Sequence, residues 1–243
     1  MIQSLRPNLE QVFGSSEQAS CLLKNISCEF SGPQIICLLG NNGSGKSTLL
    51  KICAGILEPS QGTVFLNDQN IFQLDRKQRA RDIVWQPQNL RRPYQMTVSE
   101  FMELTSPTQN GYLVSSSYFS FQEALQAFEI EEFKNQNVEN ISGGEWKRVQ
   151  LARIWQSNYK LVLLDEPDSD LDLRHKKKLV HFCQQYVLKN NAVLIIATHD
   201  IIFANELADT VCALANGYLV WNSKSDDFWK TKVVNKVFST KVF

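Results

Sequence analysis

Three uninterrupted apolar runs mark the sequence, at residues 35–39, 161–164 and 192–197. A strand that is buried on both faces gives such a run, whereas a half-exposed strand alternates apolar and polar residues. Each run is followed by a polar loop and then by a helical periodicity. Strands that alternate with helices in this way predict an α/β fold built on a parallel sheet.

Amphipathic periodicity predicts four helices, at residues 46–57, 121–128, 145–156 and 174–188. Pro59 ends the first of them. The last of these begins with the basic run RHKKK at residues 174–178, which we expect to be a solvated helix face. From Pro87 to about Ser120 the chain is rich in Gln, Ser, Thr and Pro, which indicates an insertion into the α/β pattern.

Composition narrows the class of protein. The 243 residues are 43% hydrophobic and 21% charged, close to the averages of soluble globular proteins, which disfavours a disordered chain or a coiled coil. Lys plus Arg and Asp plus Glu both number 25, so the chain lacks the basic excess that binds nucleic acid non-specifically. The six cysteines form no C-x-x-C pair, and several lie in apolar stretches, so we expect buried free thiols.

No apolar run approaches the roughly 20 residues that a membrane-spanning helix needs, so we expect none. Residues 1–10 show no secretory signal, which makes the cytoplasm the expected compartment.

A phosphate-binding loop is the strongest chemical signal. Residues 40–47, GNNGSGKS, match G-x-x-x-x-G-K-S directly after an apolar strand and before a helix. Glycines let successive backbone N–H groups turn toward an anion, and the following helix adds its positive end. Lys46 is expected to neutralise the β and γ phosphates and Ser47 to bind Mg²⁺. The nucleotide-binding candidates are Gly40, Asn41, Asn42, Gly43, Ser44, Gly45, Lys46, Ser47 and Thr48.

The second apolar run ends in Asp165 and Glu166. The carboxyl end of a parallel strand faces the crevice where such sheets bind ligands. We expect Asp165 to hold Mg²⁺ through water and Glu166 to polarise the water that attacks the phosphate.

A second anion site is predicted at residues 141–145, ISGGE. Ser142 and Glu145 have the spacing of a capping box, in which each side chain bonds the other residue's backbone N–H. Gly143 and Gly144 are each unfavourable in a helix by roughly 1 kcal/mol against alanine, so a cap alone does not explain them. Bare N–H groups at a helix start can bind an anion.

With these motifs the sequence resembles the ATP-binding cassette (ABC) ATPases, whose signature L-S-G-G-Q corresponds to residues 141–145. The resemblance covers roughly residues 21–221 and makes 40–47 the Walker A motif, 161–165 the Walker B motif and 169–172 the D-loop. It implies that Glu166 is the catalytic carboxylate and His199 the switch histidine. It also implies that Gln88 is the catalytic, Mg²⁺-sensing glutamine, with Gln86 as the alternative.

The resemblance also implies the architecture: a P-loop NTPase core with a mostly parallel sheet, an N-terminal antiparallel β portion and an inserted α-helical subdomain. As one ABC ATPase domain, the chain divides into the core at 1–87 and 158–225, the helical subdomain at 88–157 and a tail at 226–243. Two such domains bind ATP and Mg²⁺ head to tail, with Walker A of one facing the signature of the other. The implied partners are a second copy or a similar chain and, through the helical subdomain, the transmembrane permease on the inner face of the membrane.

The sequence departs from the family pattern at several positions. Glu145 replaces Gln, Asp170 replaces the usual Ala of the D-loop, and Asp168 stands where Thr is common. These carboxylates would repel phosphate unless they point away. The local candidate for the adenine-stacking aromatic is Phe13.

Residues 74–107 look like the ATPase subunits of metal-chelate importers, which carry cobalamin, iron–siderophore complexes or haem and receive cargo from a substrate-binding protein. An exporter or lipoprotein-release ATPase, a soluble non-transport ABC ATPase and a non-hydrolysing module are the alternatives. The groove that receives the permease is expected to use apolar and aromatic side chains that follow Gln88, namely Leu90, Tyr94, Met96, Phe101 and Met102. Phe101 and Met102 are equally compatible with a small core of the insertion itself.

Overall fold

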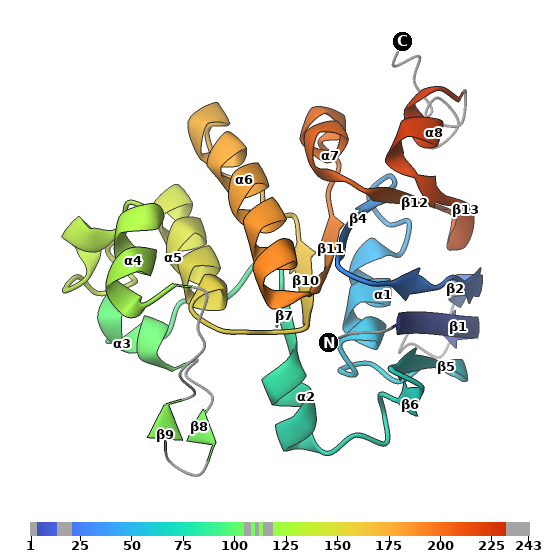
Figure 1. Ribbon diagram of the computed structural model, residues 1–243, viewed down its shortest axis with the longest axis horizontal. Coiled ribbons are helices and arrows are strands. Elements are labelled where there is room, and N and C mark those ends of the chain that lie inside the picture. Colours follow the sequence, from blue (N-terminus) through green and yellow to red (C-terminus); the bar gives the residue numbers. More distant parts are fainter. Residues whose placement is uncertain (1–3, 14–20, 105–107, 110–111, 114–118, 232–243) are drawn as a thin grey trace.

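The computed structural model describes residues 4–13, 21–104, 108–109, 112–113 and 119–231. Its centre is a set of parallel strands in the order β12-β4-β11-β10-β7 (Figure 1). Their bounds are Thr210–Ala215, Gln34–Leu39, Val193–Ala197, Leu161–Asp165 and Ile83–Gln86. The three apolar runs thus lie side by side as β4, β11 and β10, which confirms the α/β prediction.

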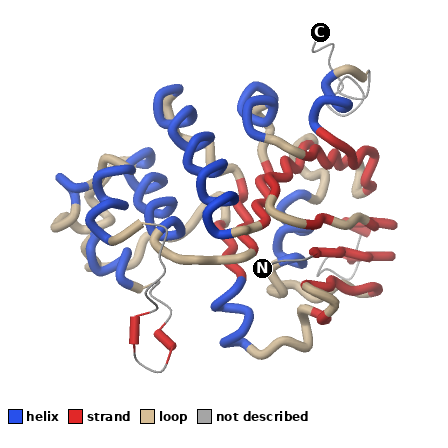
Figure 2. The backbone as a smooth tube through the Cα atoms, in the orientation of Figure 1, coloured by secondary structure: helices blue, strands red, loops and turns tan. Residues whose placement is uncertain are grey.

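The same sheet continues into an antiparallel portion, which confirms the expected N-terminal β part. β1 pairs antiparallel with β2, β3 and β5, while β13 joins this portion to β12. The strands are β1 (Ser4–Phe13), β2 (Cys21–Ser27), β3 (Phe30–Ser31), β5 (Gln61–Leu66), β6 (Gln69–Asn70) and β13 (Tyr218–Lys224). Figure 2 shows these strands gathered at one end of the molecule.

Each central strand is buried on both faces, which explains its unbroken apolar run. In β4, Ile35, Cys37 and Leu39 join a core that includes side chains of helices α6 (Leu173–Asn190) and α7 (Ile201–Leu207). Ile36 and Leu38 point the other way, into a core shared with α1 (Lys46–Cys53) and the antiparallel strands. Helices therefore cover the parallel sheet on both faces.

The segment between β7 and β10 is mainly helical and lies at the opposite end from the antiparallel strands (Figure 1). It contains α3 (Val98–Glu103), α4 (Phe121–Ala127), a 3-10 turn (Glu131–Phe133) and α5 (Gly143–Trp155), and the short pair β8 (Thr108–Gln109) and β9 (Tyr112–Leu113). We call residues 88–157 the helical insertion. Outside it, α2 (Arg76–Asp82) precedes β7, and α8 (Ser225–Trp229) follows β13.

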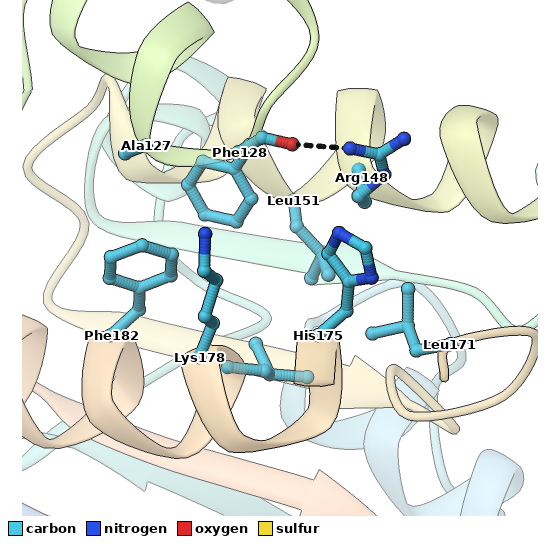
Figure 3. A pocket seen from close by; sticks show the side chains of 9 residues that line it. Ala127, Phe128, Arg148, Leu151, Leu171, His175, Lys178 and Phe182 are labelled. Atoms are coloured by element: carbon cyan, nitrogen blue, oxygen red, sulfur yellow. Dashed lines mark hydrogen bonds between the residues drawn. The ribbon is translucent and has the colours of Figure 1, made fainter. Parts of the chain in front are cut away.

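Two predictions need correction. The first predicted helix ends at Cys53 and not at residue 57, because Gly55 turns the chain with φ +68°. The basic run at the start of α6 is not simply solvated: Arg174, His175 and Lys178 pair with Glu129, which follows α4. Figure 3 shows His175 and Lys178 of α6 directed toward the side chains of α4 and α5. The sequence pattern of one helix cannot show that a carboxylate from a distant segment lies beside it.

Cys37, Cys53, Cys183 and Cys212 are buried free thiols, as predicted, whereas Cys28 is half-buried and free, and the Cys21 side chain lies outside the described residues. Within the described ranges we find no helix with the length and apolar character needed to span a membrane.

Candidate nucleotide site

The phosphate-binding loop joins β4 to α1 at the carboxyl edge of the sheet. Gly45 caps α1 in a left-handed conformation at φ 105°, and a Cβ atom there would lie 2.4 Å from the Leu23 side chain. A Cβ on Gly40 would lie 2.4 Å from the Leu214 carbonyl oxygen. These glycines are therefore required by both backbone conformation and space, and the bare backbone suits an anion.

Lys46 is 6% exposed, and its Nζ donates hydrogen bonds to the carbonyls of Gly40 (2.7 Å) and Asn41 (3.2 Å). Burial lowers the pKa of Lys46, while the charges of Glu166 and Asp165 act in the opposite direction. The ammonium thus lies within the loop itself, in the electrostatic reach of both carboxylates.

Asp165 ends β10, is 4% exposed and accepts a hydrogen bond from the Ser47 side chain. Burial is the main reason why the pKa of Asp165 is raised, and the Ser47 hydrogen bond opposes that shift. The structure therefore brings together a hydroxyl and a carboxylate, both hard oxygen donors, from α1 and β10.

The Glu166 carboxylate lies between two other predicted site residues. Gln88 Nε2 donates to Glu166 Oε2 at 2.7 Å, and His199 Nδ1 lies 3.2 Å from Glu166 Oε1. The Glu166 side chain is 11% exposed, and that of His199 is 61% exposed. The three residues follow β10, β7 and β11, which are neighbours in the sheet, so the loops at one sheet edge bring them together.

The two candidate glutamines differ in their surroundings. Gln86 is the last residue of β7, is 1% exposed and donates to the Gln150 side chain of α5. Gln88 lies two residues further on, outside the strand, and contacts Glu166. Gln88 therefore lies against Glu166, whereas Gln86 bonds to α5.

The capping-box prediction at the start of α5 is confirmed. Ser142 N donates to Glu145 Oε2 at 2.6 Å, and Glu145 N donates to Ser142 Oγ at 3.3 Å. The bond from the Ser142 N–H is the main reason why the pKa of Glu145 is lowered. Glu145 is therefore turned back onto its own helix.

The two signature glycines have different surroundings. A Cβ on Gly144 would lie 2.9 Å from the Asp170 carbonyl oxygen, whereas nothing lies within 4 Å of one on Gly143. Close packing against the D-loop thus requires Gly144, which sequence reasoning had assigned only to anion binding. The open surface at Gly143 leaves the helix start accessible to a ligand.

The unusual carboxylates are accommodated in different ways. Asp168 is buried, accepts a hydrogen bond from the Thr198 side chain and lies 3.7 Å from Lys176 Nζ, while burial raises its pKa. Asp170 is exposed and has a left-handed backbone at φ 62°. Phe13 ends β1, but its side chain lies outside the described residues, so the adenine contact stays a prediction.

The sequence analysis missed two cationic side chains, Arg92 and Lys147, that hydrogen-bond to backbone carbonyls of distant segments. Arg92 donates to the carbonyls of Ile141 (2.5 Å) and Ser142 (3.1 Å) just before α5. Lys147 is 3% exposed and donates to the carbonyls of Gln88 and Glu166. Burial lowers the pKa of Lys147, and Asp170, Asp168, Glu166 and Asp165 act against that shift. Both cations bond to backbone atoms distant in the chain, so no local motif marks them.

A family model described as ABC transporter matches residues 23–169, more than half of the chain. The chain belongs to the ABC transporter family. The ATP-binding and ATPase assignments follow from this membership and from the motifs above. In this ABC ATPase, the two predicted phosphate-binding elements lie at the starts of helices α1 and α5, which lie apart in Figure 1.

Relatives that this chain matches over most of their length agree with this assignment. The petrobactin import ATP-binding protein YclP of Bacillus subtilis is 24% identical over 91% of this chain and 88% of its own. The vitamin B12 import ATP-binding protein BtuD of Photorhabdus laumondii is 33% identical over 84% and 81%. A dimeric ATP-binding cassette in a post-hydrolysis state bound to ADP and phosphate shares the fold, with a TM-score of 0.79, 24% identity and coverage of 91% and 98%.

We expect Glu145→Gln to keep ATPase activity within about threefold of the unmodified chain, since glutamine retains the cap. Steady-state phosphate release measures this. A rise of about tenfold or more would mean that the carboxylate opposes a bound phosphate and would contradict the capping assignment.

The glutamines provide a matched pair. Gln88→Ala removes the donor to Glu166 and should lower kcat by about 10- to 100-fold with little change in melting temperature. Gln86→Ala removes a buried partner of Gln150 and should cost about 1–3 kcal/mol of unfolding free energy. Phosphate release and thermal melts of both variants test this; the reverse pattern would make Gln86 the site residue.

Proposed function

We propose that this chain is the ATP-hydrolysing subunit of a membrane importer whose cargo is a metal chelate, such as cobalamin, an iron–siderophore complex or haem. Relatives named for petrobactin and vitamin B12 import match most of their own length to this chain, which supports the proposal. The observation that carries the hydrolytic part is the Glu166 carboxylate held between Gln88 and His199 beside the phosphate loop.

The arrangement suits hydrolysis of the γ phosphate. Water must attack phosphorus while the bond to the bridging oxygen of ADP breaks, and catalysis rests on positioning and charge neutralisation. Glu166 can orient that water and accept its proton, because Gln88 and His199 hold the carboxylate on two sides. Lys46 and the glycine loop bind the phosphates.

The donor set fits Mg²⁺, which usually keeps several waters and is held by one or two carboxylates plus substrate phosphates. The Ser47 hydroxyl and the Asp165 carboxylate already share a hydrogen bond, and the Gln88 amide lies beside Glu166. These three residues would hold the ion, whose charge would offset that of the triphosphate.

We further propose that two copies of the chain, or this chain and a similar one, dimerise head to tail. The chain has one Walker A loop and one signature helix start, and each supplies only one side of an ATP sandwich. The exposed start of α5 at Ser142 and Gly143 would then face the phosphates bound by the other subunit. The fold shared with a dimeric cassette supports this arrangement.

The helical insertion would contact the permease and hold the chain at the inner face of the membrane. The burial of the candidate side chains supports a smaller contact surface than the set expected from the sequence. Phe101 and Met102 are buried core residues, and Leu90 and Met96 pack against that core. Tyr94 is 77% exposed. The contact surface is therefore centred on Tyr94, and Met96 is removed from the proposed anchors.

Glu166→Gln should keep ATP binding, slow hydrolysis by about 100-fold or more and accumulate as an ATP-bound dimer. The dimer persists because its dissociation follows ATP cleavage. Size-exclusion chromatography with light scattering, with and without ATP, measures it. Lys46→Ala is the matched control and should stay monomeric, because it loses the ammonium of the phosphate loop. A Glu166→Gln protein that binds ATP and remains monomeric would refute the sandwich.

Tyr94→Ala should leave the melting temperature and ATP binding unchanged but weaken association with the membrane subunit by about tenfold, as loss of an exposed aromatic anchor does. A pull-down of the membrane subunit measures it. Leu188→Ala, which truncates a similarly exposed side chain on α6, is the control. Equal retention by both variants would place the permease contact elsewhere.

A further inference from the structure

Lys147 occupies an unusual position. Among the described residues it and Lys46 are the buried lysines, at 3% and 6% exposure, and Lys46 belongs to the phosphate loop. Burial of an ammonium group is unfavourable unless hydrogen bonds and charges compensate it. An apolar side chain at this position of α5 would avoid the free-energy cost of burying a charge, so the ammonium of Lys147 is expected to serve a specific role.

The contacts of Lys147 connect three segments of the chain. Its Nζ donates to the Gln88 carbonyl at 3.1 Å and to the Glu166 carbonyl at 3.3 Å. These are the backbones of the two residues whose side chains bond each other at 2.7 Å. One ammonium on α5 therefore holds both members of the Gln88–Glu166 pair at their main chains.

Lys147 is also rigidly linked to the signature serine. It lies five residues after Ser142 in the same helix, about 7.5 Å along its axis. Trp146 Nε1 donates to the Leu90 carbonyl at 3.2 Å, and Arg92 bonds the carbonyls of Ile141 and Ser142. The helix that starts at Ser142 is thus tied directly to the segment that starts at Gln88.

We propose that Lys147 is a positioning residue that fixes Gln88 and Glu166 of one nucleotide site to the helix that serves the other site. The inference rests on the proposed head-to-tail dimer. In that dimer, Ser142 faces the ATP held by the partner, while Lys147 of the same helix supports the carboxylate that acts on the subunit's own ATP. The position of α5 against the partner's nucleotide thereby sets the position of Glu166.

A mixed dimer in which only one of the two nucleotide sites can hydrolyse ATP (the live site) distinguishes this positioning role from a merely structural one. One subunit carries Glu166→Gln, which keeps ATP binding and the dimer, so ATP is cleaved only at the phosphate loop of the other subunit. Lys147→Met is placed either in the subunit with the live loop or in its partner, whose signature faces the live ATP. Two affinity tags allow each dimer to be purified, and single-turnover phosphate release gives the rate.

With Lys147→Met in the live-loop subunit, we expect hydrolysis to slow by about 10- to 100-fold while binding of a fluorescent ATP analogue changes by less than about threefold. With the same variant in the partner, the rate should stay within about threefold, because that lysine supports the disabled site. If hydrolysis slows equally in both arrangements, Lys147 merely shapes the signature helix. If the rate of hydrolysis is unchanged in both, Lys147 has no role. Either result overturns the proposal.

Lys178→Met is the matched control, because Lys178 pairs with Glu129 between α6 and the helical insertion, and among the described residues it does not bond to Gln88 or Glu166. It should leave both arrangements within about threefold of the parent. If Lys147→Met yields no dimer, Lys147→Gln, whose uncharged amide is one bond shorter than the ammonium, is placed in the same two arrangements and should give the same asymmetry in a weaker form. A parent dimer without hydrolysis would refute the proposed function, whereas an active parent matched by both variants would refute the role of Lys147 alone.

Discussion

The backbone turn at Glu166 is the constraint around which the site is organised. Glu166 has φ 48°, a left-handed conformation that costs an ordinary residue about 1–2 kcal/mol. Its N–H donates to the Ala197 carbonyl at 2.8 Å, and its own carbonyl accepts from Ser169 Oγ at 2.8 Å and from Lys147. Bonds from neighbouring strand, D-loop and signature helix therefore hold the turn, and the turn directs the carboxylate toward Gln88 and His199.

The features of the fold and site that could be predicted are those encoded by residues close together in the sequence. The buried strands are unbroken apolar runs because helices cover both faces of the sheet, and the phosphate loop requires glycines at fixed positions. The capping box at Ser142 and Glu145 depends on residues three apart, so it too could be predicted. Each of these features is encoded within a few residues.

Features that depend on distant partners could not be predicted in this way. The Lys147 bonds span 59 and 19 residues, and the pairing of Lys178 with Glu129 spans 49. A basic helix start is usually solvated, and here the carboxylates that pair with it come largely from other segments, Glu129 after α4 and Asp200 before α7. Gly144 shows the same limit, since its packing against Asp170 depends on how the first turn of α5 meets a distant loop.

Overall neutrality conceals a local excess of negative charge at the nucleotide edge. Asp165, Glu166, Asp168 and Asp170 lie within six residues, where a triphosphate must also bind. Cations from separate helices limit the repulsion: Lys176 of α6 lies near Asp168, and the charge of Lys147 of α5 interacts with all four carboxylates. Charge balance at this edge therefore requires the core and the helical insertion together.

The same bonds determine how the helical insertion can move. Arg92 and Trp146 join the segment after β7 to the start of α5, so residues far apart in sequence form one body. That body reaches Glu166 through the Gln88 side chain and through Lys147. Because α5 is a continuous helix from Gly143 to Trp155, a displacement at Ser142 cannot be absorbed locally before it reaches Lys147. Mechanical linkage between the start of α5 and the Glu166 carboxylate thus follows from helix continuity and two hydrogen bonds from a single buried ammonium group.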